Sequence, residues 1–235
     1  MAKIISEDLT NNNLRVLCYT TTDGQMLSIK PDSFDAKIVA HTYTDIGRII
    51  FGMPITKIHD YTFYDCPILT SITIPDSVTM IGERAFSLCE SLTSVTIGNG
   101  VTTIGESAFE RCRKLTSVII GDSVTTIGFG AFSYCTSLTS VTIPDSVTTI
   151  DFGAFYVCKS LSRITIGKNV RKISWKAFQG CSNIDMIICR ATTPPELVLS
   201  SDSMSSSFQK FETLVVPTGC EEAYANSDWG YYLKE

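Results

Sequence analysis

Hydrophobic residues recur along this chain at a fixed interval of 23 residues, and several rows of them keep the same register. The cysteine row consists of Cys66, Cys89, Cys112, Cys135, Cys158 and Cys181. The phenylalanine row consists of Phe63, Phe86, Phe109, Phe132, Phe155 and Phe178. A leucine row runs from Leu69 to Leu161, with Ile46 one interval before it and Ile184 one interval after it. Because many positions hold register through every copy, the pattern indicates a tandem array of structural repeats.

Each unit changes its hydrophobic period along its length, as the unit that begins at Leu138 illustrates. In residues 138–143 apolar residues alternate with Ser and Thr, which predicts a short strand with one buried face. A Pro-Asp-Ser turn at 144–146 leads to a second extended arm at 147–150. In residues 153–158 the apolar positions stand at i, i+1 and i+4, a spacing that predicts one or two turns of helix.

The fold class expected from these units is an α/β repeat, a right-handed solenoid of 23-residue coils. A single unit cannot bury its apolar residues alone, so successive units should stack with a parallel sheet on one face and short helices on the other. We assign residues 46–189 to the repeats, as six units and a partial seventh. Exposed terminal coils aggregate, so residues 1–45 and 190–235 are expected to be caps. The second cap should contain a strand at 213–216 and a short helix at 221–225.

The repeat pattern, L-x-x-[IV]-x-I-P-x-S-V-x-x-I-G-x-x-A-F-x-x-C-x-x, resembles the BspA-like, Treponema-type leucine-rich repeats. The resemblance extends from Ile46 to about Cys189, and both ends of the chain also look familiar. The run from Tyr19 to Gln25 and the run that begins at Cys189 are similar to flanking segments of bacterial members. The resemblance implies a solenoid with a binding or adhesion role, since members are often bacterial surface proteins that contact host matrix proteins or other cells.

Charge and hydropathy narrow the class of partner and the compartment. The 235 residues carry a net charge of −5 and lack a strong basic stripe, which argues against a nucleic-acid partner. No segment approaches the roughly 20 apolar residues of a transmembrane helix. Residues 1–13 do not read as a signal peptide. We therefore expect a cell-surface or secreted protein if an export signal has been removed, and a cytoplasmic protein otherwise.

The cysteines and histidines, which often act in catalysis or metal binding, do not form a motif for either role. The cysteines of the row are separated by 22 residues and form no C-x-x-C pair, so we interpret them as buried small hydrophobic residues and expect no metal site. His41 and His59 lie in no recognisable triad, zinc or phosphate motif. We expect no catalytic residues, no cofactor and no enzymatic activity.

The outward positions of the predicted strands are mostly Ser and Thr, as suits a solvated sheet. Six positions depart from this pattern, namely Arg48, Ile50, Ile119, Arg163, Met186 and Ile188. Apolar and Arg side chains on a water-facing sheet can mark a contact with a partner. Those near the two ends could instead pack beneath the caps, and the sequence leaves both interpretations open.

An aromatic row is expected on the opposite side of the solenoid. Phe129, Phe152 and Trp175 share one repeat position, which holds Glu83 and Glu106 in earlier units. An exposed aromatic row is the kind of apolar patch that marks a binding surface. Stacking that only stiffens the solenoid is an equally good explanation.

The function predicted from these features is a non-catalytic scaffold for protein–protein contact or adhesion, acting as a monomer on a protein or polysaccharide ligand. Two alternatives remain open, an inert spacer and a glycan-binding module. The unit from Leu161 to Asn183 contains five basic residues and no acidic one, which could steer acidic ligands by charge. A solvated set of charges with no partner explains it as well.

Overall fold

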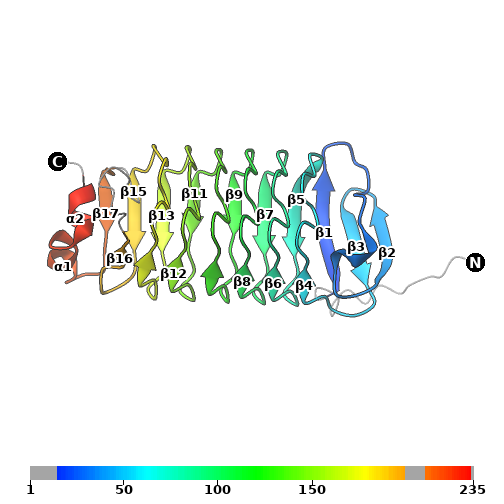
Figure 1. Ribbon diagram of the computed structural model, residues 1–235, viewed down its shortest axis with the longest axis horizontal. Coiled ribbons are helices and arrows are strands. Elements are labelled where there is room, and N and C mark those ends of the chain that lie inside the picture. The colour runs from blue at the N-terminus through cyan, green and yellow to red at the C-terminus, as the bar shows by residue number, and fades with distance from the viewer. Residues whose placement is uncertain (1–14, 199–209, 234–235) are drawn as a thin grey trace, which may run out of the picture.

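The computed structural model describes residues 15–198 and 210–233 as an elongated stack of coils (Figure 1). Antiparallel strands lie at the N-terminal end, and two short helices lie at the C-terminal end. Between them, each coil contributes one longer and one shorter strand, so the stack carries two rows of parallel strands. The solenoid expected from the 23-residue interval is confirmed.

The longer strands line one side of the stack, here called the strand face. They are β5 (Leu69–Ile74), β7 (Ser94–Ile97), β9 (Ser117–Ile119), β11 (Ser140–Thr142), β13 (Arg163–Ile166), β15 (Met186–Cys189) and β17 (Thr213–Val215). Residues 23 apart are paired, as in Ser71 with Ser94 and Arg163 with Met186. Most of their inward residues are buried, with Val118 and Leu214 half-buried, and most outward residues are Ser and Thr, because side chains in a strand point to opposite faces in turn.

The shorter strands form a second parallel sheet that runs without interruption along the stack. They are β4 (Lys57–Ile58), β6 (Met80–Ile81), β8 (Thr103–Ile104), β10 (Thr126–Ile127), β12 (Thr149–Ile150), β14 (Lys172–Ile173) and β16 (Glu196–Leu197). The isoleucine of each strand from β4 to β14 points into the core and is fully buried.

The short helix expected in each coil is replaced by a series of turns. Gly153 and Val157 have positive φ angles of 61° and 59°, and other coils have φ angles between 48° and 79° at these positions. A right-handed helix cannot continue through such residues. The i, i+1, i+4 spacing therefore reflects consecutive turns that direct Ala154, Phe155 and Cys158 inward, and we call this side of the stack the turn side.

The core between the two sheets is built from ladders of identical side chains. The rings of Phe109 and Phe132 stack with centroids 5.1 Å apart and planes 4° from parallel, and neighbouring rings of the row repeat this geometry. Beside them, the Sγ of Cys135 donates a hydrogen bond to the carbonyl oxygen of Phe109 at 3.2 Å. The same bond recurs from each cysteine of the row between Cys89 and Cys181.

The N-terminal end departs from the parallel arrangement. Strands β1 (Val16–Thr21), β2 (Ile38–Tyr43) and β3 (Gly47–Phe51) are antiparallel, and a short 3-10 helix, η1 (Pro31–Ser33), lies between β1 and β2. β1 lies between β3 and β5, so the strand that follows Ile46 is not part of the parallel ladder. The expectation that this unit begins the parallel sheet is corrected accordingly.

At the C-terminal end, β17 extends the parallel sheet beyond β15, and helices α1 (Glu221–Ala225) and α2 (Asp228–Tyr232) follow it. The strand and the first helix lie where the sequence predicts them. Trp229 of α2 is fully buried and donates a hydrogen bond from Nε1 to the carbonyl oxygen of Pro195 at 2.8 Å. α2 thus packs beside β16 at the end of the stack.

Candidate partner-binding surfaces

The thiols of the cysteine row from Cys89 to Cys181 are enclosed in the core, whereas Cys66, which was expected to be buried too, is half-buried. Burial raises the pKa of Cys89, Cys112, Cys135 and Cys158 far above the ordinary thiol value, because it penalises the thiolate. Across residues 15–198 and 210–233, no group of three or more His, Cys, Asp or Glu residues is arranged to hold a metal ion. These four buried thiols are disfavoured as thiolate nucleophiles, and they pack the core.

Both histidines bind groups of the N-terminal region. The Nε2 of His41 lies 2.5 Å from the hydroxyl of Tyr19, and the Nδ1 of His59 lies 2.9 Å from the carbonyl oxygen of Asp32. Desolvation lowers the pKa of His41. Tyr19 also accepts a hydrogen bond from the backbone N–H of Leu27. The His41 contact joins β1 to β2, and the His59 contact joins η1 to the residue that follows β4.

Arg48 and Ile50 lie together at the N-terminal end of the strand face. Both are half-buried on β3 and line a hollow of about 340 Å³. β1 contributes Val16 and Cys18 to this N-terminal hollow, and β5 contributes Thr73. The sequence alone did not indicate the two β1 residues, because their contact with Arg48 depends on an antiparallel pairing between distant segments.

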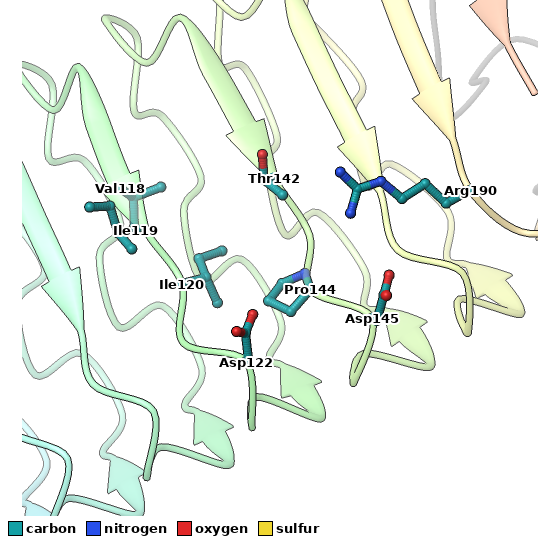
Figure 2. A pocket seen from close by; sticks show the side chains of 8 residues that line it. All are labelled: Val118, Ile119, Ile120, Asp122, Thr142, Pro144, Asp145 and Arg190. Carbon is teal, nitrogen blue, oxygen red and sulfur yellow. The ribbon is translucent and has the colours of Figure 1, made fainter.

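Ile119 is the most exposed apolar residue of the strand face, with 60% of its surface accessible. It lines a second hollow of about 430 Å³, here called the central hollow, together with Pro144 and Arg190 (Figure 2). Neither Pro144 nor Arg190 was singled out from the sequence. A departure from the repeat could have drawn attention to Pro144, because the coils on both sides have glycine at this position, Gly121 and Gly167.

Arg163, Met186 and Ile188 lie side by side at the C-terminal end of the strand face. Arg163 pairs with Met186 across β13 and β15, and Ile188 pairs with Val215 of β17. Met186 and Ile188 are half-buried, whereas Val215 is 44% exposed. This C-terminal patch is apolar with one guanidinium at its edge.

The predicted aromatic row is present on the turn side. Phe129 stacks on Phe152 with ring centroids 4.9 Å apart and planes 4° from parallel. Phe152 contacts Trp175 edge-on at 5.2 Å. The ammonium of Lys176 lies 4.4 Å from the Trp175 ring centroid, a cation–π contact. Phe129, at one end of this aromatic row, remains 46% exposed.

A second aromatic row runs parallel to the first. Tyr134 and Tyr156 meet edge-to-face at 5.4 Å, and the guanidinium of Arg111 lies 5.6 Å from the Tyr134 ring centroid. The two rows enclose a hollow of about 230 Å³, which we call the aromatic groove. Gly130 and Gly153 line it at the positive-φ position where other coils have Ser107 or Lys176, so no side chain from that position enters the groove in these two coils.

The nine predicted contact residues therefore fall into four separate places. The structure brings together Arg48 with Ile50, Arg163 with Met186 and Ile188, and Phe129 with Phe152 and Trp175. Ile119 lies apart from the other predicted residues, in the central hollow. The groove residues that the sequence analysis missed are Gly130, Gly153 and Lys176, whose roles depend on the positive-φ turn.

Comparison with known proteins identifies the family of this chain. The BspA type leucine rich repeat region matches residues 56–185 in six copies, and the chain belongs to this family. No curated protein matches the chain. No helix in the described parts of the chain is long and apolar enough to cross a bilayer.

Three solved structures show what this chain is similar to. The leucine rich repeat protein of T. pallidum is 28% identical with a TM-score of 0.60, and the match covers 80% of this chain and 75% of that one. A leucine rich cell surface protein from Faecalibacterium prausnitzii is 31% identical with a TM-score of 0.58, over 83% of this chain and 54% of that protein. The pneumococcal vaccine antigen PcpA, 19% identical with a TM-score of 0.57, covers 76% of this chain and 42% of its own and shares the fold.

Proposed function

We propose that this protein is a non-catalytic binding module that holds a partner protein through the aromatic groove. The observation that carries the proposal is the pair of aromatic rows on the turn side, which leave Phe129 half exposed beside an open hollow. Water-exposed aromatic rows are costly unless a partner covers them, and aromatic side chains are enriched among interface hot spots.

The orientation of the rings favours a protein over a polysaccharide. Phe129 and Phe152 cover one face of each other, so the groove offers ring edges and the outer face of Phe129, together with the tyrosine side chains. Sugar rings stack on exposed aromatic faces, whereas an apolar side chain can pack against edges. Glu110 and Lys176 at the groove add charges of both signs for a polar rim.

A surface location is part of the same proposal. The Faecalibacterium relative is described as a cell surface protein, and this chain spans about half of its length. An adhesion role at a bacterial surface would place the groove where it can meet host or cell-surface proteins. Glycan binding and an inert spacer remain the alternatives.

The test uses purified protein against a panel of extracellular-matrix proteins and a glycan array. Phe129→Glu and Phe152→Glu restore the residue that Glu83 and Glu106 supply in earlier coils, so the fold should tolerate both. We expect saturable binding to a protein, weakened about thirtyfold or more by either substitution, which corresponds to about 2 kcal/mol.

Thr96→Ala on the strand face is the matched control and should bind like the wild type. Binding confined to the glycan array would favour the glycan module. Protein binding that both aromatic variants retain would move the contact away from the groove, and no binding to either panel would favour the spacer.

A further inference from the structure

Tyr19 of β1 reaches across β3 to β2 within the N-terminal sheet. β3 lies between the other two strands, and its Gly47 pairs with both Tyr19 and Tyr43. A Cβ atom on Gly47 would overlap the ring of Tyr19, so the tyrosine occupies the space that a side chain of β3 would need. The glycine therefore allows the Tyr19 hydroxyl to meet His41 of β2.

The Tyr19 hydroxyl binds two segments that follow β1 in the chain. It accepts the backbone N–H of Leu27 at 3.2 Å, and it lies 2.5 Å from the Nε2 of His41. A hydroxyl has one hydrogen to donate, and a neutral Nε2 without hydrogen accepts it. Every group in the contact is then paired, although Tyr19 is only 1% exposed. Among the described residues Tyr19 has no other hydrogen-bond partner.

The environment of both rings favours this neutral pair. Burial raises the pKa of Tyr19, and the Tyr43 hydroxyl and the Cys66 thiol raise it further, so the hydroxyl keeps its hydrogen where histidine titrates. Desolvation lowers the pKa of His41, because a half-buried ring loses hydration that its cation needs.

The charged groups around His41 do not compensate a positive charge on its ring. Arg48 of β3 lies opposite Thr42, the residue after His41, and adds a like charge. Asp23 and Asp45 in the flanking turns are exposed, and each accepts a backbone N–H of its own turn. In the described part of the chain no carboxylate forms an ion pair with His41.

Protonation of His41 is incompatible with this pairing. A hydrogen on Nε2 points at the Tyr19 oxygen, so the hydroxyl hydrogen has to turn away and has no acceptor at a buried site. The imidazolium regains hydration only by moving outward. β2 can follow it, because β2 is the outermost strand of its sheet and pairs with β3 alone (Figure 1).

We propose that Tyr19 and His41 form an acid-sensitive clasp, and that protonation of His41 releases β2 and residues 22–27 from β1. Because the pKa of His41 is lower in the folded protein, the clasp is stable above the ordinary value of 6.5 and weakens as the pH falls below it. β1 and β3 also line the N-terminal hollow, so acid alters that surface and leaves the aromatic groove unchanged.

The test measures amide hydrogen exchange of the whole protein by NMR at pH 7.5 and pH 5.0. The protection factor of Leu27, corrected for the intrinsic rate at each pH, should fall about tenfold or more in acid. Gly128, whose N–H bonds to the carbonyl oxygen of Ile104 in the middle of the stack, should keep its protection within about twofold.

The chain has only two histidines, so variants separate them cleanly. The amide of a glutamine reaches the position of Nε2, accepts the Tyr19 hydrogen and does not titrate. His41→Gln should therefore hold the protection of Leu27 within about twofold between the two pH values, whereas His59→Gln should retain the wild-type decrease. Tyr19→Phe provides a second variant: the Gly52 amide, which bonds to the residue before β2, should lose protection in acid in the wild type but not in this variant.

Constant protection of Leu27 in the wild type would overturn the proposal. The same loss in His41→Gln, or its disappearance in His59→Gln, would overturn it as well, because another group would then be the sensor. An equal loss at Gly128 would mean that acid unfolds the whole stack and does not open a local clasp.

Discussion

The Sγ of Cys135 donates its hydrogen bond to the carbonyl oxygen of Phe109, which lies in the preceding coil, at 3.2 Å. The bond joins neighbouring coils at the point where the turns leave a carbonyl group facing the core. A thiol fits there because it is small, largely apolar and still a weak donor. Repetition of the bond through the stack explains why Cys recurs at every 23rd position.

The first prediction is that the protein loses stability in mild alkali. Burial raises the folded-state pKa of Cys89, Cys112, Cys135 and Cys158 above their ordinary value of 9.0. The stabilising contribution is therefore complete below about pH 9 and is lost at higher pH, because only the unfolded chain releases these protons. The free energy of unfolding should fall by up to about 1.4 kcal/mol per thiol per pH unit.

Urea denaturation between pH 7.5 and 10.5 measures this slope. Cys135→Ala removes one of the buried thiols and should make the slope shallower by the amount due to that thiol. An unfolding free energy that stays constant up to pH 10.5 would mean that the thiols are not protected in the folded protein.

The second prediction compares the stability contributions of two stacked phenylalanines in the same coil that differ in burial. Phe132 is fully buried and stacks on Phe155 at 5.3 Å, whereas Phe129 is 46% exposed and stacks on Phe152 at 4.9 Å. Phe132→Ala leaves a cavity in the core and should lower the free energy of unfolding by about 3–5 kcal/mol. Phe129→Ala should cost about 1 kcal/mol, since stacking contributes little beyond the area it buries.

Thermal and urea unfolding of the two variants provides the comparison. Similar losses for both would show that exposed stacking stiffens the solenoid, the alternative explanation of the aromatic row. A small loss for Phe129→Ala leaves that ring available for binding a partner.

The solenoid could be predicted from the sequence because its core consists of identical residues that recur at a fixed interval. A Phe or Cys at every 23rd position can stack only if the coils are equal in length. The turns were mistaken for a helix because hydrophobic spacing records which residues point inward and not the backbone angles between them. Val157, at a φ angle of 59°, is a β-branched residue that gives no hint of such a conformation.

The candidate binding surfaces were only partly predictable from the sequence. Phe129, Phe152 and Trp175 stood out since one register changes from Glu to aromatic. The missing pairing between β9 and β11 was not predicted, because the repeat pattern continues through both coils without a change.

The third prediction concerns the C-terminal end of the stack, which is expected to cap the solenoid. Trp229 is fully buried, and its indole N–H bonds to the carbonyl oxygen of Pro195. Trp229→Ala should lower the free energy of unfolding by about 3–5 kcal/mol and promote aggregation, because the last coil loses its cover. Tyr231→Ala, two residues away and 73% exposed, should change it by less than about 0.5 kcal/mol.

Urea unfolding and light scattering of both variants measure these effects. A Trp229→Ala protein that stays monomeric, with wild-type stability, would show that the end of the stack needs no cap. In that case the division of the chain into repeats and caps would have to be redrawn.

The fourth prediction assigns the face that binds once a protein ligand is in hand. Trp175 lies in the aromatic row of the turn side, and Arg163 lies in the C-terminal patch of the strand face. Binding through the aromatic groove requires Trp175→Ala to weaken the complex about thirtyfold, or about 2 kcal/mol, since Trp175 supports Phe152 and Lys176 at the groove. Arg163→Ala should then bind within about twofold of the wild type, as should the control Thr96→Ala.

Titration calorimetry with each variant gives the three affinities. Loss only in Arg163→Ala would assign recognition to the C-terminal patch, and loss only in Thr96→Ala would assign it to another part of the strand face. The comparison is informative because the two tested residues come from the same coil and share its stability, while their side chains point to different sides of the stack.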